Sequence, residues 1–123
     1  MIKIAFFDVD GTLLKLGSKV PSFQTVQTLQ QLQAKGILLC MATGRGYLSV
    51  PHFEGVDFDL WLTFNGSYVR SKDAVISKNP LDADDKRRIL HNLKQMHRAA
   101  AISNEHFIVT NWSSIFPSAT RSW

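Results

Sequence analysis

The sequence has 123 residues, of which 45% are hydrophobic and 20% are charged, so it has the length of one modest domain and the composition of an ordinary globular protein. This composition excludes a disordered acidic chain and a collagen-like fibre. The net charge of +4 suits anionic small molecules as well as nucleic acids, so charge alone does not select a partner.

The sequence carries no signal for a membrane or for secretion. No apolar run approaches the ~20 residues that cross a bilayer. The single cysteine, Cys40, lies in the apolar run of residues 37–42 and is expected to be a buried thiol. One cysteine cannot form an internal disulfide, which is compatible with a reducing compartment. We therefore expect a cytoplasmic protein.

Three short apolar runs in the first half of the chain are predicted to be buried strands, at residues 3–7, 37–42 and 60–64. Each run stops at a polar turn that contains glycine. Apolar residues recur at helical spacing over residues 22–36 and predict a helix between the first two strands. Apolar runs without alternation are typical of parallel strands covered on both faces. The pattern predicts an α/β fold with a Rossmann-like parallel sheet.

The pattern changes after residue 66. Residues 67–70 and 74–77 are predicted to form a hairpin, and residues 83–96 to form an amphipathic helix. Two more short strands are expected at residues 100–103 and 106–110. Together these elements are predicted to form a separate α+β layer.

These elements suggest three parts of the chain. Residues 1–66 form the N-terminal half of a Rossmann-like core, which is incomplete on its own. Residues 67–111 form the start of an α/β cap, and residues 112–123 form a tail without helical or strand periodicity.

Asp8 and Asp10 follow the first predicted strand and lie two residues apart. In extended backbone both side chains project to one side, with Cα atoms roughly 6 to 7 Å apart. Like charges at that separation repel by roughly 2.5 kcal/mol at an effective dielectric constant of ~20, so the pair either raises one pKa or recruits a cation. Mg²⁺ is the natural cation because it uses one or two carboxylates and further oxygens from a phosphate. The alternative is an Asx turn, in which either carboxylate only accepts a backbone hydrogen bond.

Two further polar turns follow the second and third strands, where ligands bind in open α/β sheets. Thr43 offers a hydroxyl and Gly44 lets a backbone N–H approach closely, so this turn could hold phosphate oxygens. Arg45 is either a phosphate ligand or a solvated or ion-paired structural residue. Asn65 supplies an amide and Gly66 supplies clearance, although an Asn-Gly pair alone usually marks only a turn.

These motifs resemble those of the haloacid dehalogenase superfamily. Residues 7–14, Phe-Asp-Val-Asp-Gly-Thr-Leu-Leu, are similar to its first signature, and residues 42–45, Ala-Thr-Gly-Arg, are similar to its second. Residues 65–66 resemble the loop before the inserted α/β cap in the Cof-like sugar-phosphatase branch. The resemblance spans about residues 2–111.

The resemblance implies a Mg²⁺-dependent phosphatase that acts on small phosphorylated metabolites, with sugar phosphates as the expected class, through an aspartyl-phosphate. Asp8 would be the nucleophile and a metal ligand. Asp10 would protonate the leaving oxygen and later accept a proton from water, while its backbone carbonyl binds the metal. Thr43 would bind the transferring phosphoryl group, and Thr12 would brace the loop.

The family pattern also requires a lysine after the cap and a later acidic cluster, and neither can be assigned in this sequence. A predicted helix begins beside Asp82, Asp84 and Asp85. Carboxylates are favoured there because the N-terminus of a helix is the positive end of its dipole. Members of this kind continue well beyond this length, so we expect a truncated chain that ends inside the cap and has weak or absent turnover. In the family's sheet the first strand is central, so residues 3–7 would lie at an exposed edge open to self-association.

Other functions were weighed against the phosphatase. A noncatalytic remnant could bind a metal or a partner chain through its open edge. A receiver domain requires an acceptor aspartate after the third strand, where this chain has Asn65. The basic residues of 86–88 lack interleaved aromatic residues, so a solvated helix is preferred to nucleic-acid binding.

Overall fold

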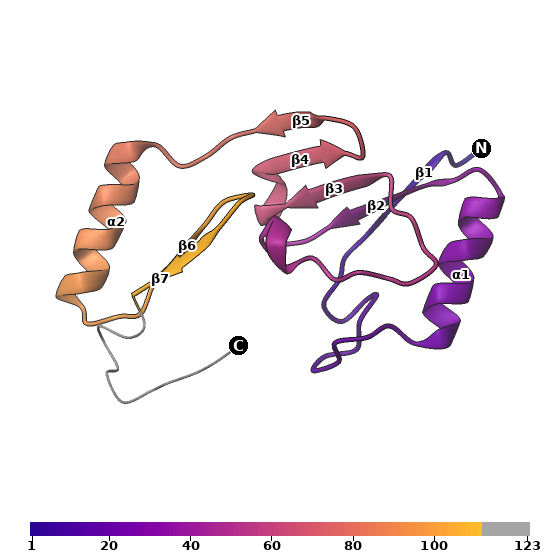
Figure 1. The fold of residues 1–123 in the computed structure, drawn as a ribbon, viewed down its shortest axis with the longest axis horizontal. Helices are drawn as coiled ribbons and strands as arrows, with labels where there is room; N and C mark the ends of the chain where they lie inside the picture. Colours follow the sequence, from indigo (N-terminus) through magenta and orange to yellow (C-terminus); the bar gives the residue numbers. More distant parts are fainter. Residues whose placement is uncertain (112–123) are drawn as a thin grey trace. The chain divides into compact units, whose positions relative to one another are not determined.

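The computed structural model describes residues 1–111, and the predicted irregular tail at 112–123 lies outside the described residues. The chain divides into two compact units, Met1–Asn79 and Pro80–Trp123. The elements drawn in Figure 1 are β1 (Ile4–Phe7), α1 (Phe23–Ala34), β2 (Leu38–Ala42), β3 (Leu60–Thr63), β4 (Tyr68–Ser71), β5 (Val75–Lys78), α2 (Ala83–Gln95), β6 (Ala101–Ser103) and β7 (Ile108–Thr110). Two short 3₁₀ helices, η1 (Tyr47–Ser49) and η2 (Phe64–Gly66), follow β2 and β3.

The first unit contains a five-stranded sheet in the order β1-β2-β3-β4-β5. The pairs β1–β2 and β2–β3 are parallel, and the pairs β3–β4 and β4–β5 are antiparallel. The predicted α/β class is therefore confirmed, with a mixed sheet that is parallel over its first three strands. The strand β1 is at the edge of this sheet, as the sequence predicts.

The hairpin β4–β5 extends this sheet, whereas the sequence suggested a separate layer beginning at residue 67. The strand β4 pairs antiparallel with β3, with Ser71 opposite Leu60 at one end and Tyr68 opposite Thr63 at the other. This pairing is possible because η2 reverses the chain direction within three residues. The compact units divide after Asn79 instead. A functional cap at residues 67–111 stays a prediction.

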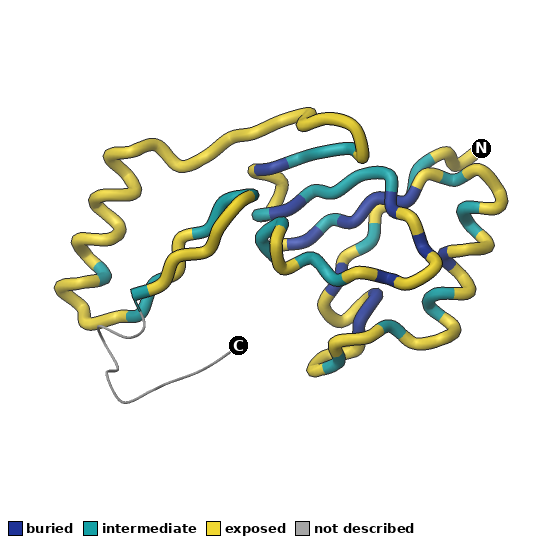
Figure 2. Tube along the Cα trace, in the orientation of Figure 1, coloured by how far each residue is buried: buried dark blue, intermediate teal, exposed yellow. Residues whose placement is uncertain are grey.

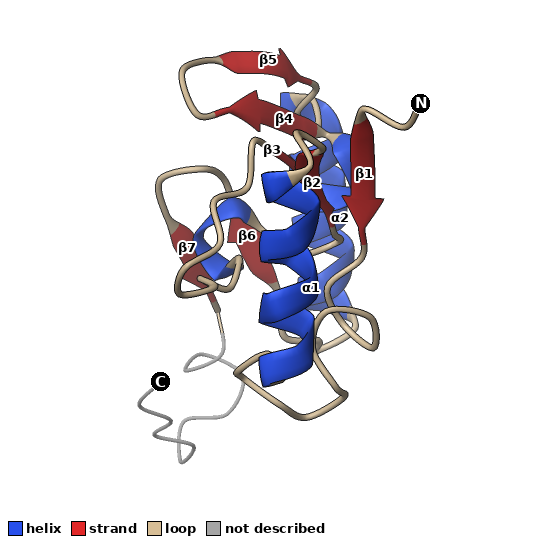
Figure 3. Ribbon diagram, turned by 90° about the vertical axis from the view of Figure 1, so that its right-hand side faces the viewer, coloured by secondary structure: helices blue, strands red, loops and turns tan. Residues whose placement is uncertain are grey.

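The core of the first unit lies on one face of the sheet, under α1 (Figure 3). Phe7, Met41 and Trp61 stand opposite one another in the strand register and so point to this face. The buried members of the core are Val9, Leu13, Leu14, Leu29, Leu39, Met41, Phe53, Val56 and Phe58. The helix begins after Ser22, whose side chain accepts a hydrogen bond from the Thr25 backbone N–H.

The second unit has a different character in its described part. The helix α2 begins after Asp82, whose carboxylate accepts the Asp85 N–H at 2.8 Å, which confirms the predicted helix capping. The antiparallel pair β6–β7 follows. No residue from 80 to 111 is buried (Figure 2).

Cys40 is completely buried in β2, as predicted from its apolar neighbours. Burial raises the pKa of its thiol to about 11. Neither described helix is long and apolar enough to cross a membrane.

Candidate active site

Three loops meet where β1, β2 and β3 end. The three strands are parallel and adjacent, so their carboxyl ends lie at one edge of the sheet. Asp8 follows β1 directly, Thr43 follows β2, and Asn65 lies in η2 directly after β3. The fold therefore brings the candidate residues of all three motifs to the same edge.

The first loop is a tight turn held by its own backbone. The Gly11 N–H donates to the Leu14 carbonyl at 2.7 Å, and the Leu14 N–H donates to the Val9 carbonyl at 2.8 Å. Gly11 has φ +92°, a conformation that a side chain disfavours. The Thr12 hydroxyl lies 3.4 Å from Asp8 Oδ2, where it can brace the carboxylate only weakly. The loop thus leaves Asp8 and Asp10 exposed at the end of β1.

Arg45 joins the first loop to the second through a two-pronged ion pair with Asp10. Arg45 Nε donates to Asp10 Oδ2 at 2.8 Å, and Nη2 donates to Oδ1 at 2.6 Å. The remaining nitrogen, Nη1, donates to the Ser49 carbonyl at 3.1 Å. This fork geometry fixes the guanidinium plane as well as its distance. Of the two interpretations left open by the sequence, the structure shows Arg45 as an ion-pair partner.

This ion pair shifts the pKa values of both partners. Hydrogen bonding to Arg45 is the main reason that the pKa of Asp10 is lowered, and the charge of Arg45 adds to it. The same contact raises the pKa of Arg45. Both side chains are partly exposed, with 51% of Asp10 and 32% of Arg45 accessible, so solvent screens the attraction. Asp10 is therefore held as a carboxylate at neutral pH.

The second and third loops are joined mainly through their backbones. The Asn65 N–H donates to the Thr43 carbonyl at 3.1 Å, and the Phe64 N–H donates to the Arg45 carbonyl at 2.9 Å. A Cβ at Gly44 would lie 2.9 Å from Asn65 Oδ1, so glycine permits this close approach. Thr43 is buried, and its hydroxyl accepts the Arg45 N–H at 3.1 Å. A hydroxyl can accept and donate at once, so it can still donate to a phosphate oxygen.

Sequence reasoning missed three contributors to this edge. Ser49 and Phe64 act through backbone atoms, and a backbone hydrogen bond leaves no side-chain signal in a sequence. Tyr47 packs edge-on against Tyr68 at 5.7 Å between ring centroids and lies under the Arg70 guanidinium at 5.2 Å. These contacts tie the segment after Thr43 to β4.

The oxygen-rich residues of the first loop fit Mg²⁺ only in part. Among residues 1–111 no cluster of three or more His, Cys, Asp or Glu side chains could hold a metal ion. Both carboxylate oxygens of Asp10 are engaged by Arg45, which leaves the Asp8 carboxylate as the ionic ligand. Mg²⁺ is commonly bound by one or two carboxylates together with water and substrate phosphate. The donor set is compatible with that mode and does not form a complete protein cage.

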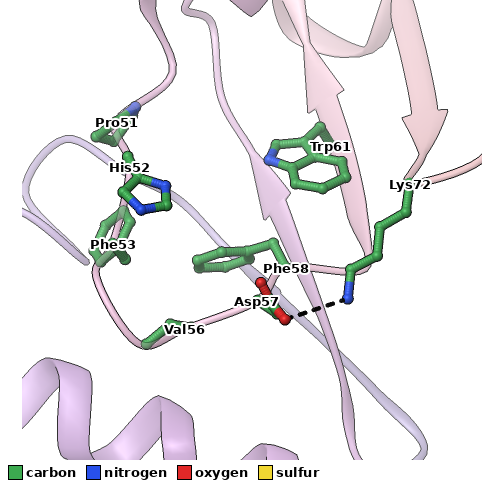
Figure 4. Close-up of a pocket in the computed structure, with 8 residues that line it drawn as sticks. All are labelled: Pro51, His52, Phe53, Val56, Asp57, Phe58, Trp61 and Lys72. Carbon is green, nitrogen blue, oxygen red and sulfur yellow. Dashed lines mark ion pairs between the residues drawn. The ribbon is translucent and has the colours of Figure 1, made fainter.

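A pocket of about 260 Å³ lies in the first unit around the start of β3 (Figure 4). Its lining residues are Pro51, His52, Phe53, Val56, Asp57, Phe58, Trp61 and Lys72. Lys72 pairs with Asp57 at 4.0 Å and with Asp59 at 3.7 Å. None of the predicted site residues lines this pocket, so it is separate from the candidate active site.

The sequence profile of the haloacid dehalogenase-like hydrolases matches residues 5–120, nearly the whole chain. The chain belongs to this family. The haloacid dehalogenase-like protein described here is 35% identical to YkrA of Bacillus subtilis over 89 residues, which are 72% of this chain and 34% of YkrA. It is 34% identical to the HMP-PP phosphatase of an Enterobacter species over 119 residues, which are 91% of this chain and 40% of that enzyme.

A solved structure with a similar fold is that of the phosphatase BT1666 from Bacteroides thetaiotaomicron. The TM-score is 0.77 at 28% sequence identity, and the match covers 90% of this chain and 42% of BT1666. This haloacid dehalogenase-like chain therefore spans about two fifths of the length of the proteins it matches. The predicted superfamily and partial fold are confirmed.

Proposed function

We propose that this haloacid dehalogenase-like chain forms the phosphoryl-transfer half of a phosphatase that acts on small phosphorylated metabolites. The observation that carries the proposal is the convergence of three loops at one sheet edge, where the Asp10–Arg45 ion pair joins the first loop to the Thr43 turn. Support comes from the family match and from relatives that are named as phosphatases. Sugar phosphates remain the expected substrate class.

In the first step Asp8 acts as the nucleophile. A carboxylate oxygen of Asp8 forms a bond to phosphorus while the bond from phosphorus to the leaving oxygen breaks, which gives an aspartyl-phosphate. Asp10 donates a proton to the leaving oxygen, so it must be protonated at that point. In the structure Asp10 is paired with Arg45, which lowers the pKa of Asp10 and favours its carboxylate form. The pair must therefore open and Asp10 must take up a proton before it can act. Thr43 and the backbone at Gly44 would bind the phosphate oxygens.

In the second step a water molecule hydrolyses the aspartyl-phosphate. Asp10, now deprotonated, accepts a proton from the water. The water oxygen bonds to phosphorus, and the bond between phosphorus and the Asp8 oxygen breaks. Arg45, once released from Asp10, can bind phosphate oxygens with the same fork of donors. Mg²⁺ held by Asp8, and by the Asp10 carbonyl as the family resemblance implies, would screen the repulsion between carboxylate and phosphate.

Hydrolysis of an aryl phosphate in the presence of Mg²⁺ tests this proposal. We expect turnover that is slow for the 123-residue chain, because no described cluster of side chains completes the metal site. The Asp8→Asn substitution should abolish it. Activity that survives in Asp8→Asn would contradict the role of Asp8. The control is Asp73→Asn, an exposed carboxylate in the β4–β5 turn outside the three loops.

A noncatalytic role as a partner-binding module is the second candidate. It is favoured by the position of β1 at the edge of the sheet, where one side of the strand has no neighbour in the described sheet. Size-exclusion chromatography with light scattering distinguishes the two candidates. A chain that is monomeric, binds no partner and hydrolyses an aryl phosphate would reject the noncatalytic role.

A further inference from the structure

The Arg45 guanidinium is held by two different kinds of acceptor. Its Nε and Nη2 atoms donate to the Asp10 carboxylate, whereas Nη1 donates to the Ser49 carbonyl at 3.1 Å. A phosphate is anionic, so its oxygens can compete with the carboxylate for Nε and Nη2. The Ser49 carbonyl is uncharged backbone and lies on the other side of the fork. The bond to Ser49 can therefore remain when Arg45 exchanges Asp10 for a phosphate.

The Ser49 carbonyl belongs to η1 (Tyr47–Ser49), which is too short to hold its own position. Within this segment the Ser49 N–H donates to the Gly46 carbonyl at 2.9 Å, and the Val50 N–H donates to the Tyr47 carbonyl at 3.4 Å. A single 3₁₀ turn has poor hydrogen-bond geometry and gains little from such bonds. The place of the Ser49 carbonyl must therefore be set by contacts that η1 makes with other elements.

The ring of Tyr47 makes these contacts from the middle of the segment between Arg45 and Ser49. It stands edge-on to the Tyr68 ring, with 5.7 Å between the centroids and 61° between the planes. The Arg70 Cζ atom lies over the same ring, 5.2 Å from its centroid. We call Tyr47, Tyr68 and Arg70 the Tyr47 cluster. Its contacts use the ring of Tyr47 and not the hydroxyl.

The two other members of the cluster are fixed on β4. Tyr68 and Arg70 are two positions apart on this strand, so their side chains leave the same face of the sheet. Tyr68 is 5% exposed and stands opposite Thr63 of β3. The Arg70 guanidinium donates to the Ser71 carbonyl at 2.9 Å and to the Lys72 carbonyl at 3.2 Å. The cluster therefore joins η1 to a strand that is paired on both sides.

We propose that Tyr47 is a positioning residue for phosphate binding. It holds the Ser49 carbonyl in place, so that Arg45 turns from Asp10 to a phosphate oxygen while Nη1 stays bonded. Tyr47 does not touch the phosphate and acts through Arg45. The inference rests on the proposed function for the presence of a phosphate at this sheet edge. It deepens that function by naming the residue that keeps Arg45 at the site.

Two NMR measurements on the 123-residue chain test the proposal. The exchange of the Arg45 Nε–H with water reports how firmly the guanidinium is held. Titration with inorganic phosphate in the presence of Mg²⁺ gives a dissociation constant. Tyr47→Leu removes the ring and should raise both quantities about tenfold, the equivalent of one hydrogen bond to a charged group. Tyr47→Phe keeps the ring and should have the values of the parent.

Phe58→Leu is the matched control. Phe58 stands edge-on to Phe53 with 5.5 Å between the centroids and 61° between the planes, which is close to the geometry of Tyr47 and Tyr68. Phe58 belongs to the core cluster and lies outside the three loops. Phe58→Leu should lower the melting temperature and leave Arg45 exchange and phosphate affinity unchanged. Circular dichroism checks that each variant is folded.

A milder variant decides the matter if Tyr47→Leu does not fold. Arg70→Met removes the cation over the Tyr47 ring and keeps the length of the side chain. It should raise Arg45 exchange and the phosphate dissociation constant about threefold. In that case unchanged values in folded Arg70→Met overturn the inference.

A double-variant cycle separates positioning from general packing. Arg45→Met removes the guanidinium and should weaken phosphate binding at least as much as Tyr47→Leu does. Adding Tyr47→Leu to Arg45→Met should cause no further loss, because Tyr47 acts through Arg45. Additive losses would show that Tyr47 acts independently of Arg45 and would overturn the inference.

The outcomes separate this inference from the proposed function. Unchanged Arg45 exchange and phosphate affinity in folded Tyr47→Leu overturn the inference, and so does an equal change in Phe58→Leu. A parent chain that hydrolyses an aryl phosphate, with Tyr47→Leu binding phosphate equally well, supports the function and contradicts the inference. Phosphate binding that depends on Tyr47, in a chain that hydrolyses no aryl phosphate, supports the inference and contradicts the function.

Discussion

The two α-helices within residues 1–111, the part of the chain that the structure describes, are specified in opposite ways. The helix α1 has no acidic residue in its first turn and no basic residue in its last turn, yet it buries Leu29 against the sheet. The helix α2 has acidic residues in its first turn and Lys94 in its last turn, yet none of its residues is buried. The comparison shows that strong local signals and tertiary packing are independent, because α2 has the first without the second.

The largest expected effect separates the two helices by their packing. Leu29 is 2% exposed, so Leu29→Ala should lower the free energy of unfolding of the first unit by about 2 to 5 kcal/mol. Ile89 is 44% exposed, so Ile89→Ala in α2 should change stability by less than about 0.5 kcal/mol. Urea denaturation followed by circular dichroism measures both. Equal losses would show that α2 packs as tightly as α1.

A smaller effect tests the caps. Ser22→Ala removes the hydrogen bond to the Thr25 N–H and should cost about 1 kcal/mol. Asp82→Ala removes the bond to the Asp85 N–H and should unwind the first turn of α2, which has no buried residue to hold it. Amide exchange at Thr25 and Asp85 reports each cap. Faster exchange at Thr25 than at Asp85 would reverse the expected order.

The Asp10–Arg45 ion pair allows a test of how charged side chains contribute to the stability of the first unit. An acid with a lowered pKa in the folded state binds fewer protons there, so the pair stabilises the fold above the ordinary pKa of 3.8. This contribution is lost as the pH falls through the lowered value. Arg45→Met should therefore return the Asp10 pKa towards its ordinary value. Carboxyl ¹³C NMR titration measures this shift, and an unchanged titration curve would mean that the pair is absent in solution.

The smallest effect concerns a single close approach between two loops. Gly44→Ala places a Cβ 2.9 Å from Asn65 Oδ1, so the Asn65 side chain must rotate at a cost below about 1 kcal/mol. The side-chain amide signals of Asn65 should shift in NMR spectra. The double variant Gly44→Ala with Asn65→Gly removes the contact and keeps the positive φ accessible at position 65. It should recover the melting temperature of the parent, and a further loss would point to the backbone of residue 44.

The sequence predicted the elements well where the signal is local. The two α-helices and seven strands found in the described part of the chain lie within a few residues of the expected ranges, because apolar runs, caps and glycine stops act over short distances. The place of β4–β5 in the core sheet could not be predicted, since a hairpin carries no mark of the strand it joins. The partner of Arg45 could not be predicted either. Asp10 lies 35 positions earlier, and a contact over that distance leaves no local signal in the sequence.

The parallel pairing of β1 sets the order in which the candidate active site can be assembled. Ile4 stands opposite Leu38, and Phe7 stands opposite Met41. During synthesis the strand that precedes Asp8 leaves the ribosome first, but its partner follows only after the helix between them has been made. The residue proposed to attack phosphorus is thus translated before the strand whose pairing fixes its folded position.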